Sequence, residues 1–421
     1  MGYTLAEKIL ARASSQAEVK PQQFVTANVD RVMIQDSGTE RLYPILEEAG
    51  VNRVWDANKV AFFQDHYVPA ASVNRAEVLK KERNVVESLG VRNIYGQNVG
   101  VSHQVMMEKG WVLPGELIVA TDSHTPMYGA LGAAGTGIGV SEMAYVLATG
   151  TLWFMVPHTI KFVLQGKLQY PVMSKDIILH IAGRYSTSVA QYKAIEFVGP
   201  VADQMSIDSR MTMCNMGMEI GAKFAFFKPD EKVKEYLTFR TDEKLNFVTP
   251  DDDASYEKIY KVDVSGLEPQ VAQPYAVDNV KPISQIEKTK IDQAVLGSCT
   301  NGRLEDLRIA AAILKGKKIH NRTRLLVIPA SMEIYKAALV EGILGTFIDS
   351  GAMICNPGCG PCFGAHMGLL ASGETCIASI NRNFKGRMGS PESRVFLASP
   401  ATVAASAIEG QIADPRNHYK G

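Results

Sequence analysis

Residues 115–124 read GELIVATDSH, in which four consecutive apolar residues are followed at once by a polar run. Two earlier stretches have the same form, RVMIQDSG at 31–38 and KVAFFQDH at 59–66. A short apolar run that ends in polar residues is typical of a buried strand in a parallel sheet. Helical patterns occupy residues 77–89 and 141–152. The alternation predicts an α/β fold for this part of the chain.

The α/β alternation returns in the last third of the chain. Strand-like runs are expected at 291–298, 324–331 and 351–355, with helical patterns at 304–316 and 332–344. Before them, residues 265–285 contain three prolines, which predicts an extended linker. These changes in sequence pattern and composition predict domain boundaries near residues 157 and 275 and indicate at least two α/β lobes.

Composition excludes several classes of protein. The 421 residues contain 44 Lys and Arg and 44 Asp and Glu, so the formal net charge is zero and a nucleic-acid-binding protein is disfavoured. The least charged region, residues 127–160, has too many glycines for a membrane span. No signal or transit pattern is visible in the first 20 residues. We expect a cytoplasmic protein that binds neither nucleic acid nor membrane.

Six cysteines are too few for a disulfide scaffold and indicate chemistry in a reducing compartment. Cys359 and Cys362 form a C-x-x-C motif, and Cys299 follows a predicted strand. With Cys355 these thiols could close a structural zinc site, or three of them could hold an iron–sulfur cluster. The C-x3-C-x2-C spacing also occurs in radical enzymes, but only 59 residues follow Cys362, too few for their barrel. Cys214 and Cys376 are expected to be buried as small apolar residues.

Polar residues suited to chemistry follow several of the predicted strands. In open parallel sheets, ligands bind beyond the carboxyl ends of the strands. His66, His103 and His124 lie in polar contexts and suit proton transfer if a carboxylate orients them. The polar groups at predicted strand ends are Gln35, Asp36, Asp65, His66, Asp122, Ser123, His124, Cys299, Cys359 and Cys362.

Five ordered motifs carry a resemblance to a known family. ATDSHT, CNMGMEIGA, GSCTNGR, CGPC and NRNFKGRMG begin at residues 120, 214, 297, 359 and 381. In this order and at these separations they resemble the aconitase superfamily of iron–sulfur hydro-lyases. The likeness covers essentially the whole chain. It implies three α/β domains around a cleft that holds a [4Fe–4S] cluster. With the boundaries that the sequence pattern gives, these domains are 1–157, 158–275 and 276–421.

The resemblance implies a role for each matching residue. Cluster ligands would be Cys299, Cys359 and Cys362, with Asn215 and Asn381 beside the cluster. Oriented pairs that handle the departing hydroxyl would be His66 with Asp65, His103 with Asp122, and His124 with Glu219. Substrate carboxylates would be bound by Gln35, Ser123, Arg382 and Arg387, and a guanidinium suits a carboxylate independently of the family.

The length resembles the large subunit of the family's two-subunit branch, which includes 3-isopropylmalate dehydratase, homoaconitase and 2,3-dimethylmalate dehydratase. Single-chain members carry a further mobile C-terminal domain with the serine base, for which this sequence shows no motif. The resemblance therefore implies a small-subunit partner, in a heterodimer or heterotetramer, that supplies this domain. Cys355 is surplus to the three ligands and is expected to be a spare thiol, or a substitute for an oxidised ligand.

These expectations predict an enzyme that dehydrates and rehydrates a hydroxy di- or tricarboxylate, with 3-isopropylmalate as the favoured substrate. Homoaconitase and 2,3-dimethylmalate dehydratase are the alternatives within the branch. From other classes, a cluster-sensing RNA-binding regulator and a zinc-binding structural subunit stay open.

Overall fold

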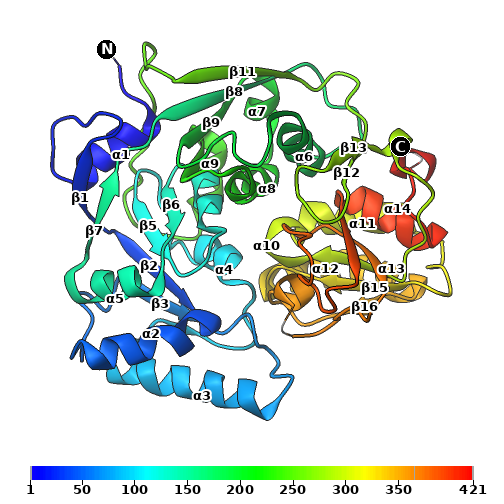
Figure 1. Ribbon diagram of the computed structural model, residues 1–421, viewed down its shortest axis with the longest axis horizontal. Helices are drawn as coiled ribbons and strands as arrows, with labels where there is room; N and C mark the ends of the chain where they lie inside the picture. The colour runs from blue at the N-terminus through cyan, green and yellow to red at the C-terminus, as the bar shows by residue number, and fades with distance from the viewer. Residues whose placement is uncertain (1, 365, 420–421) are drawn as a thin grey trace. The chain divides into compact units, whose positions relative to one another are not determined.

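A computed structural model describes residues 2–364 and 366–419, and the chain separates into two compact units (Figure 1). Unit 1 comprises Met1–Gln97, Val105–Gln165 and Ala190–Val262. Unit 2 comprises Asn98–Gln104, Gly166–Val189 and Asp263–Gly421. Helix α4 (Ser102–Glu108) begins in the first segment of unit 2 and ends in unit 1.

The first sheet of unit 1 is parallel throughout the described residues. Its order is β4 (Ile94–Tyr95), β3 (Val60–Phe63), β2 (Arg31–Gln35), β5 (Leu117–Ala120) and β6 (Ala134–Gly137). Every residue of β3 and β5 is buried, which explains why these strands are apolar without alternation. Helix α2 (Asp36–Glu48) packs against α3 (Val73–Ser88) and α5 (Val140–Thr149) (Figure 1).

Unit 1 contains two more sheets. One has the order β10 (Phe224–Phe227), β9 (Ala194–Val198), β8 (Thr159–Gln165) and β11 (Lys258–Asp263). The other pairs β1 (Phe24–Asn28) with β7 (Thr151–Met155) in antiparallel fashion. The remaining helices are α1 (Leu5–Ala13), α7 (Pro200–Gln204), α8 (Ile207–Gly217) and α9 (Glu231–Leu237), with 3-10 turns η1 (Thr125–Leu131) and η2 (Met218–Ile220). Helix α8 packs on η1, which follows the ATDSH motif.

Unit 2 is built on a seven-stranded mixed sheet. Its order is β13 (Val280–Pro282), β12 (Gln270–Ala272), β18 (Arg394–Leu397), β17 (Thr375–Ala378), β14 (Gln293–Gly297), β15 (Arg324–Ile328) and β16 (Met353–Ile354). The helices are α6 (Ser174–Tyr185), α10 (Ser298–Asn301), α11 (Leu304–Leu314), α12 (Met332–Val340), α13 (Ile343–Ser350) and α14 (Pro400–Glu409). Three 3-10 turns complete the unit: η3 (Ile283–Gln285), η4 (Gly360–Phe363) and η5 (Pro415–Asn417).

The α/β fold predicted from the sequence is confirmed, with one correction to its connections. Residues 265–285 are not a free linker, because they form β12 and β13 at one edge of the sheet of unit 2, and β12 is fully buried. The three large sheets follow one another along the chain, but the first two lie in the same compact unit. The division at 157 and 275 stays a prediction. No helix among the described residues is long and apolar enough to cross a membrane.

Candidate active site

Polar side chains gather at the carboxyl ends of three neighbouring strands in unit 1. Strand β2 lies between β3 and β5, and all three run parallel, so their carboxyl ends share one edge of the sheet. The side chains placed there are Gln35, Asp36, Asp65, His66, Asp122, Ser123 and His124. Most of them are buried, while Asp122 and Ser123 are half-buried. The structure therefore brings these residues of unit 1 together, as the strand-end argument predicts.

His66 is enclosed by carboxylates. Its Nδ1 lies 2.6 Å from Oδ1 of Asp65, and its Nε2 lies 3.8 Å from Oδ2 of Asp122. Burial lowers the pKa of His66, but the neighbouring carboxylates, Asp65 first, outweigh it and raise the pKa to about 10. At neutral pH the imidazole holds a proton that it could donate to a substrate oxygen.

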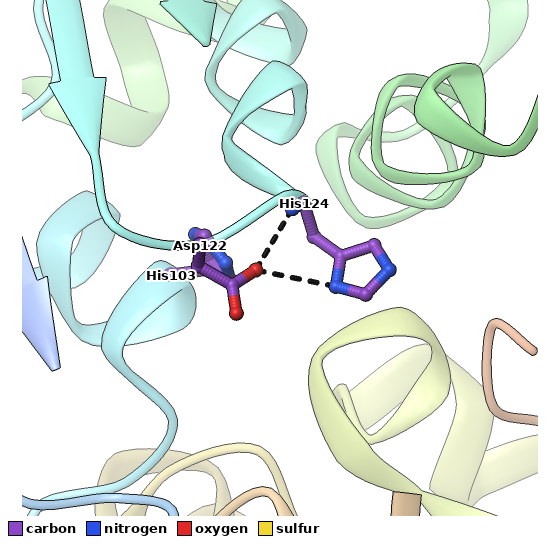
Figure 2. Close-up of side chains that lie close together, drawn as sticks. All are labelled: His103, Asp122 and His124. Atoms are coloured by element: carbon purple, nitrogen blue, oxygen red, sulfur yellow. Dashed lines mark hydrogen bonds and ion pairs between the residues drawn. The ribbon is translucent and has the colours of Figure 1, made fainter. Parts of the chain in front are cut away.

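His124 lies between two carboxylates of unit 1. Its Nε2 is 3.1 Å from Oε1 of Glu219, which η2 supplies after α8. On the other side of the ring, Nδ1 lies 3.2 Å from Oδ1 of Asp122, and the backbone N–H of His124 donates to the same oxygen at 2.8 Å. Figure 2 shows both contacts from Asp122 to His124. The ring is thus fixed in orientation at both nitrogens.

Gln35 extends the polar network to the end of β2. Its Nε2 donates to Oδ2 of Asp122 at 3.2 Å and lies 3.4 Å from the carbonyl of Thr121. This side-chain amide therefore sits beside the carboxylate that also orients His124. A polar amide at this point could bind a substrate carboxylate, which is the role that the resemblance implies.

Two of the expected residues are buried, but their expected contacts stay predictions. His103 lies in the first turn of α4 and is buried. His103 belongs to unit 2 and Asp122 belongs to unit 1, so the pairing of His103 with Asp122 stays a prediction. Asn215 is buried in α8, where its Nδ2 lies 3.4 Å from Sδ of Met127. Its place beside a cluster is also not assigned.

The three predicted cluster ligands lie on two adjoining segments of unit 2. Cys299 is in α10, directly after β14. Cys359 immediately precedes η4, and Cys362 lies within it. All three side chains are buried. Ser298 joins the segments, because its hydroxyl lies within 3.5 Å of the carbonyl oxygen of Cys359.

Polar groups support the Cys299 segment on both sides. The thiol of Cys299 donates to Oδ1 of Asn381 at 3.5 Å, and the hydroxyl of Thr300 donates to the same oxygen. The fully buried guanidinium of Arg303 donates to the carbonyl of Cys299 at 2.8 Å. Asn381 therefore lies beside Cys299, and its place beside a cluster stays a prediction.

The donor set fits an iron–sulfur cluster. Three buried cysteines can supply the thiolate ligands that such a cluster takes. Burial raises the pKa of the fourth thiol, Cys355, to about 11.

The two predicted substrate arginines follow β17 in unit 2. Arg382 and Arg387 are half-buried, and Nε of Arg387 is buried. Lys175, fully buried in α6, donates to the carbonyls of Ser379 and Ile380 at 3.2 and 2.7 Å. This lysine holds the chain just before Asn381 and thereby fixes the start of the arginine-bearing loop.

Comparison with known proteins decides the family. The model of the aconitase family (aconitate hydratase) matches residues 7–289 and 279–410. These two ranges span nearly the whole chain. The chain belongs to the aconitase family.

Full-length relatives in the aconitase family are named as subunits of hydro-lyases. The chain is 51% identical over 416 residues to 3-isopropylmalate dehydratase large subunit 1 of Methanopyrus kandleri, which covers 99% of both chains. It is 47% identical over 416 residues to the probable methanogen homoaconitase large subunit of Methanothermobacter thermautotrophicus, which covers 98% of this chain and 97% of that one.

A solved structure agrees at the level of fold alone. The holo-form crystal structure of Thermococcus kodakaraensis aconitase X matches with a TM-score of 0.50 at 13% identity and covers 85% of this chain and 84% of that one. The aconitase-type α/β fold expected from the motifs is therefore confirmed. Members of the aconitase family are generally iron–sulfur enzymes.

Two buried carboxylates of this aconitase-family chain had no role in the sequence argument. Asp36 was noted at a strand end, and the structure places its carboxylate against the backbone of His66. Glu82 lies on α3 between Lys81 and Arg83, and a carboxylate among charged neighbours gives no signal of burial. Its carboxylate accepts from the hydroxyl of Thr39 at 2.9 Å. The position of Asp36 after an apolar strand was the only available signal.

Proposed function

We propose that this chain is the large subunit of a hydro-lyase of the 3-isopropylmalate dehydratase type. It would interconvert 3-isopropylmalate and its positional isomer by removing and returning water. The identity of 45–51% to large subunits of that name, over almost the full length of both proteins, supports the assignment. The observation that carries it is one chain holding both a buried His66 in contact with Asp65 and three buried cysteines.

The proposed cofactor is a [4Fe–4S] cluster held by Cys299, Cys359 and Cys362. Three thiolates on four irons leave one iron open as a Lewis acid, which can polarise a substrate hydroxyl. Asn381 lies beside Cys299, so its side-chain amide would lie next to the bound cluster.

The reaction needs a proton for the departing oxygen, because hydroxide is a poor leaving group. His66 holds a proton at neutral pH and is fixed by Asp65, so we assign it the role of the acid. His124, held by Glu219 and Asp122, is a second oriented imidazole that can bind or relay a proton. His103 with Asp122 is the third pair in the proposal.

Substrate carboxylates must be held while negative charge develops on the neighbouring carbon. Arg382 and Arg387 are suited to this because a guanidinium binds a carboxylate through two parallel hydrogen bonds. Gln35 and Ser123 add neutral donors at the strand ends of unit 1. These groups would orient the substrate and stabilise the charge that builds as the C–H bond breaks.

The relatives are named large subunits, so we propose a small-subunit partner in a heterodimer or heterotetramer. This partner would supply the mobile domain and the serine base that removes the carbon-bound proton. We place the complex in the cytoplasm, where free cysteines stay reduced.

The test is anaerobic purification of the chain, iron and sulfide analysis with EPR, and assay with a candidate small subunit on 3-isopropylmalate. We expect close to four irons and four sulfides per chain and turnover only when both subunits are present. One zinc without sulfide, or full turnover by the chain alone, would contradict the proposal.

One relative favours a second substrate. The probable homoaconitase large subunit is 47% identical over nearly the full length, close to several of the dehydratases. The substrates of homoaconitase and of dimethylmalate dehydratase are hydroxy acids like 3-isopropylmalate. They differ from it in the side chain next to the hydroxy acid group. A panel of these acids, assayed with one small subunit at a time, separates the alternatives through kcat/KM. We expect 3-isopropylmalate to have the highest value.

A further inference from the structure

Asp36 is completely buried where β2 passes into α2. Its Oδ1 accepts the backbone N–H of Ser37 at 2.8 Å, and its Oδ2 accepts that of Tyr67 at 3.0 Å. The backbone N–H of His66 lies 3.3 and 3.2 Å from the two oxygens. One carboxylate at the end of β2 thus binds the backbone of the loop that follows β3. Three N–H donors to one carboxylate make a strong, directional support.

The same carboxylate also faces the imidazole. Oδ1 of Asp36 lies 3.6 Å from Nδ1 of His66, compared with 2.6 Å for Oδ1 of Asp65. Asp122 faces the other nitrogen of the ring at 3.8 Å. The carboxylates that surround the imidazole in unit 1 thus come from three different strand ends. Their combined field outweighs the burial that opposes a charged ring.

A second buried carboxylate, Glu82 of α3, lies behind Asp36. Burial raises the pKa of Asp36 to about 6, so the group is mostly ionised at neutral pH. Burial also raises the pKa of Glu82 well above its usual range. The carboxylate of Glu82 accepts a hydrogen bond from the hydroxyl of Thr39. Arg75, also on α3, stacks over the ring of Tyr67 at 4.0 Å.

We infer that Asp36 is a positioning residue for His66: it fixes the backbone of the His66 loop and, with Asp65, holds the proton on the imidazole. Neither the motifs nor the names of the relatives give it this role. The inference deepens the proposed function, on which the use of that proton rests. The pKa of His66 itself can be measured without turnover.

The test is an NMR titration of the full-length chain with isotope-labelled histidine, in which His66→Gln identifies the signal. Asp36→Asn removes the charge and turns an amide N–H toward the backbone donors. We expect the pKa of His66 to fall by about one unit or more, because one carboxylate of three is lost. Asp30→Asn is the matched control. Asp30 precedes β2 at its other end and accepts the N–H of Leu117 at 2.7 Å, so its loss should not move His66.

An unchanged pKa of His66 in folded Asp36→Asn would overturn the inference. If Asp36→Asn does not fold, the NMR titration of the wild-type chain tests the inference instead. The His66 signal should show a second inflection near pH 6, where Asp36 takes up its proton. A single inflection would overturn the inference.

Turnover of the complete enzyme separates this inference from the proposed function. In Asp36→Asn the high-pH limb of kcat/KM should move to lower pH, by the same shift that NMR records. If the wild-type complex turns over none of the hydroxy acids, the proposed function fails. The titration still decides whether Asp36 positions His66.

Discussion

Asp122 shows how much one carboxylate organises at the scale of single residues. It accepts from the side chain of Gln35 and from the backbone of His124, contacts the His124 ring, and faces Nε2 of His66. Two imidazoles and an amide are therefore oriented by one side chain that is itself half-buried. The arrangement fixes the rings, but Asp65 makes the shorter contact with His66.

Replacement of Asp65 by Asn tests the acid role of His66. The amide removes the nearest charge and can accept from Nδ1 only in one orientation, so the proton is held less firmly. We expect kcat to fall by about 10²–10⁴-fold, as for loss of oriented acid catalysis, with little change in KM. Steady-state kinetics of the complete enzyme measure this. Glu47→Gln, on the exposed side of α2, is the control, and equal kcat in both variants would contradict the assignment.

The raised pKa of His66 also makes a prediction about stability. The pKa is about 10 in the folded chain and 6.5 for an exposed imidazole, so the folded state binds the proton more tightly. The resulting stabilisation is fully present below pH 6.5 and is lost as the pH rises through about 10. Urea unfolding of wild type and His66→Gln across this range should show a stability difference that shrinks with increasing pH. A difference that does not depend on pH would refute the proposed charge state.

At the scale of elements, the strands that carry the site are predictable from sequence and some connections are not. β2, β3, β5 and β14 each combine an apolar run with a polar end, so burial and strand direction are both visible. Strands β12 and β13, at one edge of the sheet of unit 2, were not predicted because the prolines in this stretch resemble those of a linker, although proline is compatible with edge strands.

Sequence reasoning also missed a break in the helix expected at 332–344. The structure splits it into α12 and α13 at Gly342, which has a φ of +73° and ends the helical geometry. For the candidate site, sequence reasoning identified the motif residues and placed Asp36 at a strand end, but it gave Asp36 no partner. It missed Glu82, because a buried carboxylate and a solvated one look alike in sequence.

The contact between η1 and β10 gives an element-scale prediction. A Cβ on Gly129 would lie 1.6 Å from the carbonyl oxygen of Ala225, and the backbone at both positions is buried. Gly129→Ala should therefore destabilise the chain by about 3 kcal/mol or more, the upper end for overpacking. Gly345→Ala is the control, because nothing lies within 4 Å of its added Cβ and alanine favours helix α13 by about 0.5–1 kcal/mol. Thermal unfolding that shows equal effects of the two substitutions would contradict the close approach.

At the scale of the whole molecule, the two units carry different parts of the proposed chemistry. Unit 1 holds His66 and His124 at the end of its parallel sheet, and unit 2 holds His103 as well as the cysteines and arginines after β14 and β17. Each set is supported by its own core, centred on strands of its own sheet. The segments that carry the three cysteines are short helical turns, whereas His66 and His124 follow fully buried strands.

This division predicts where cluster binding should change the dynamics. A group that binds only when three thiolates are assembled stabilises those conformations and suppresses local opening of the segments that carry them. Comparison of the cluster-loaded and cluster-free chain by hydrogen exchange should show slower exchange at residues 297–303 and 359–364. The strands β2, β3 and β5 should be unaffected. Cys299→Ser should remove the effect and Cys355→Ser should keep it, because Cys355 is surplus to the three ligands. Equal protection in Cys299→Ser, or protection confined to unit 1, would place the cluster elsewhere.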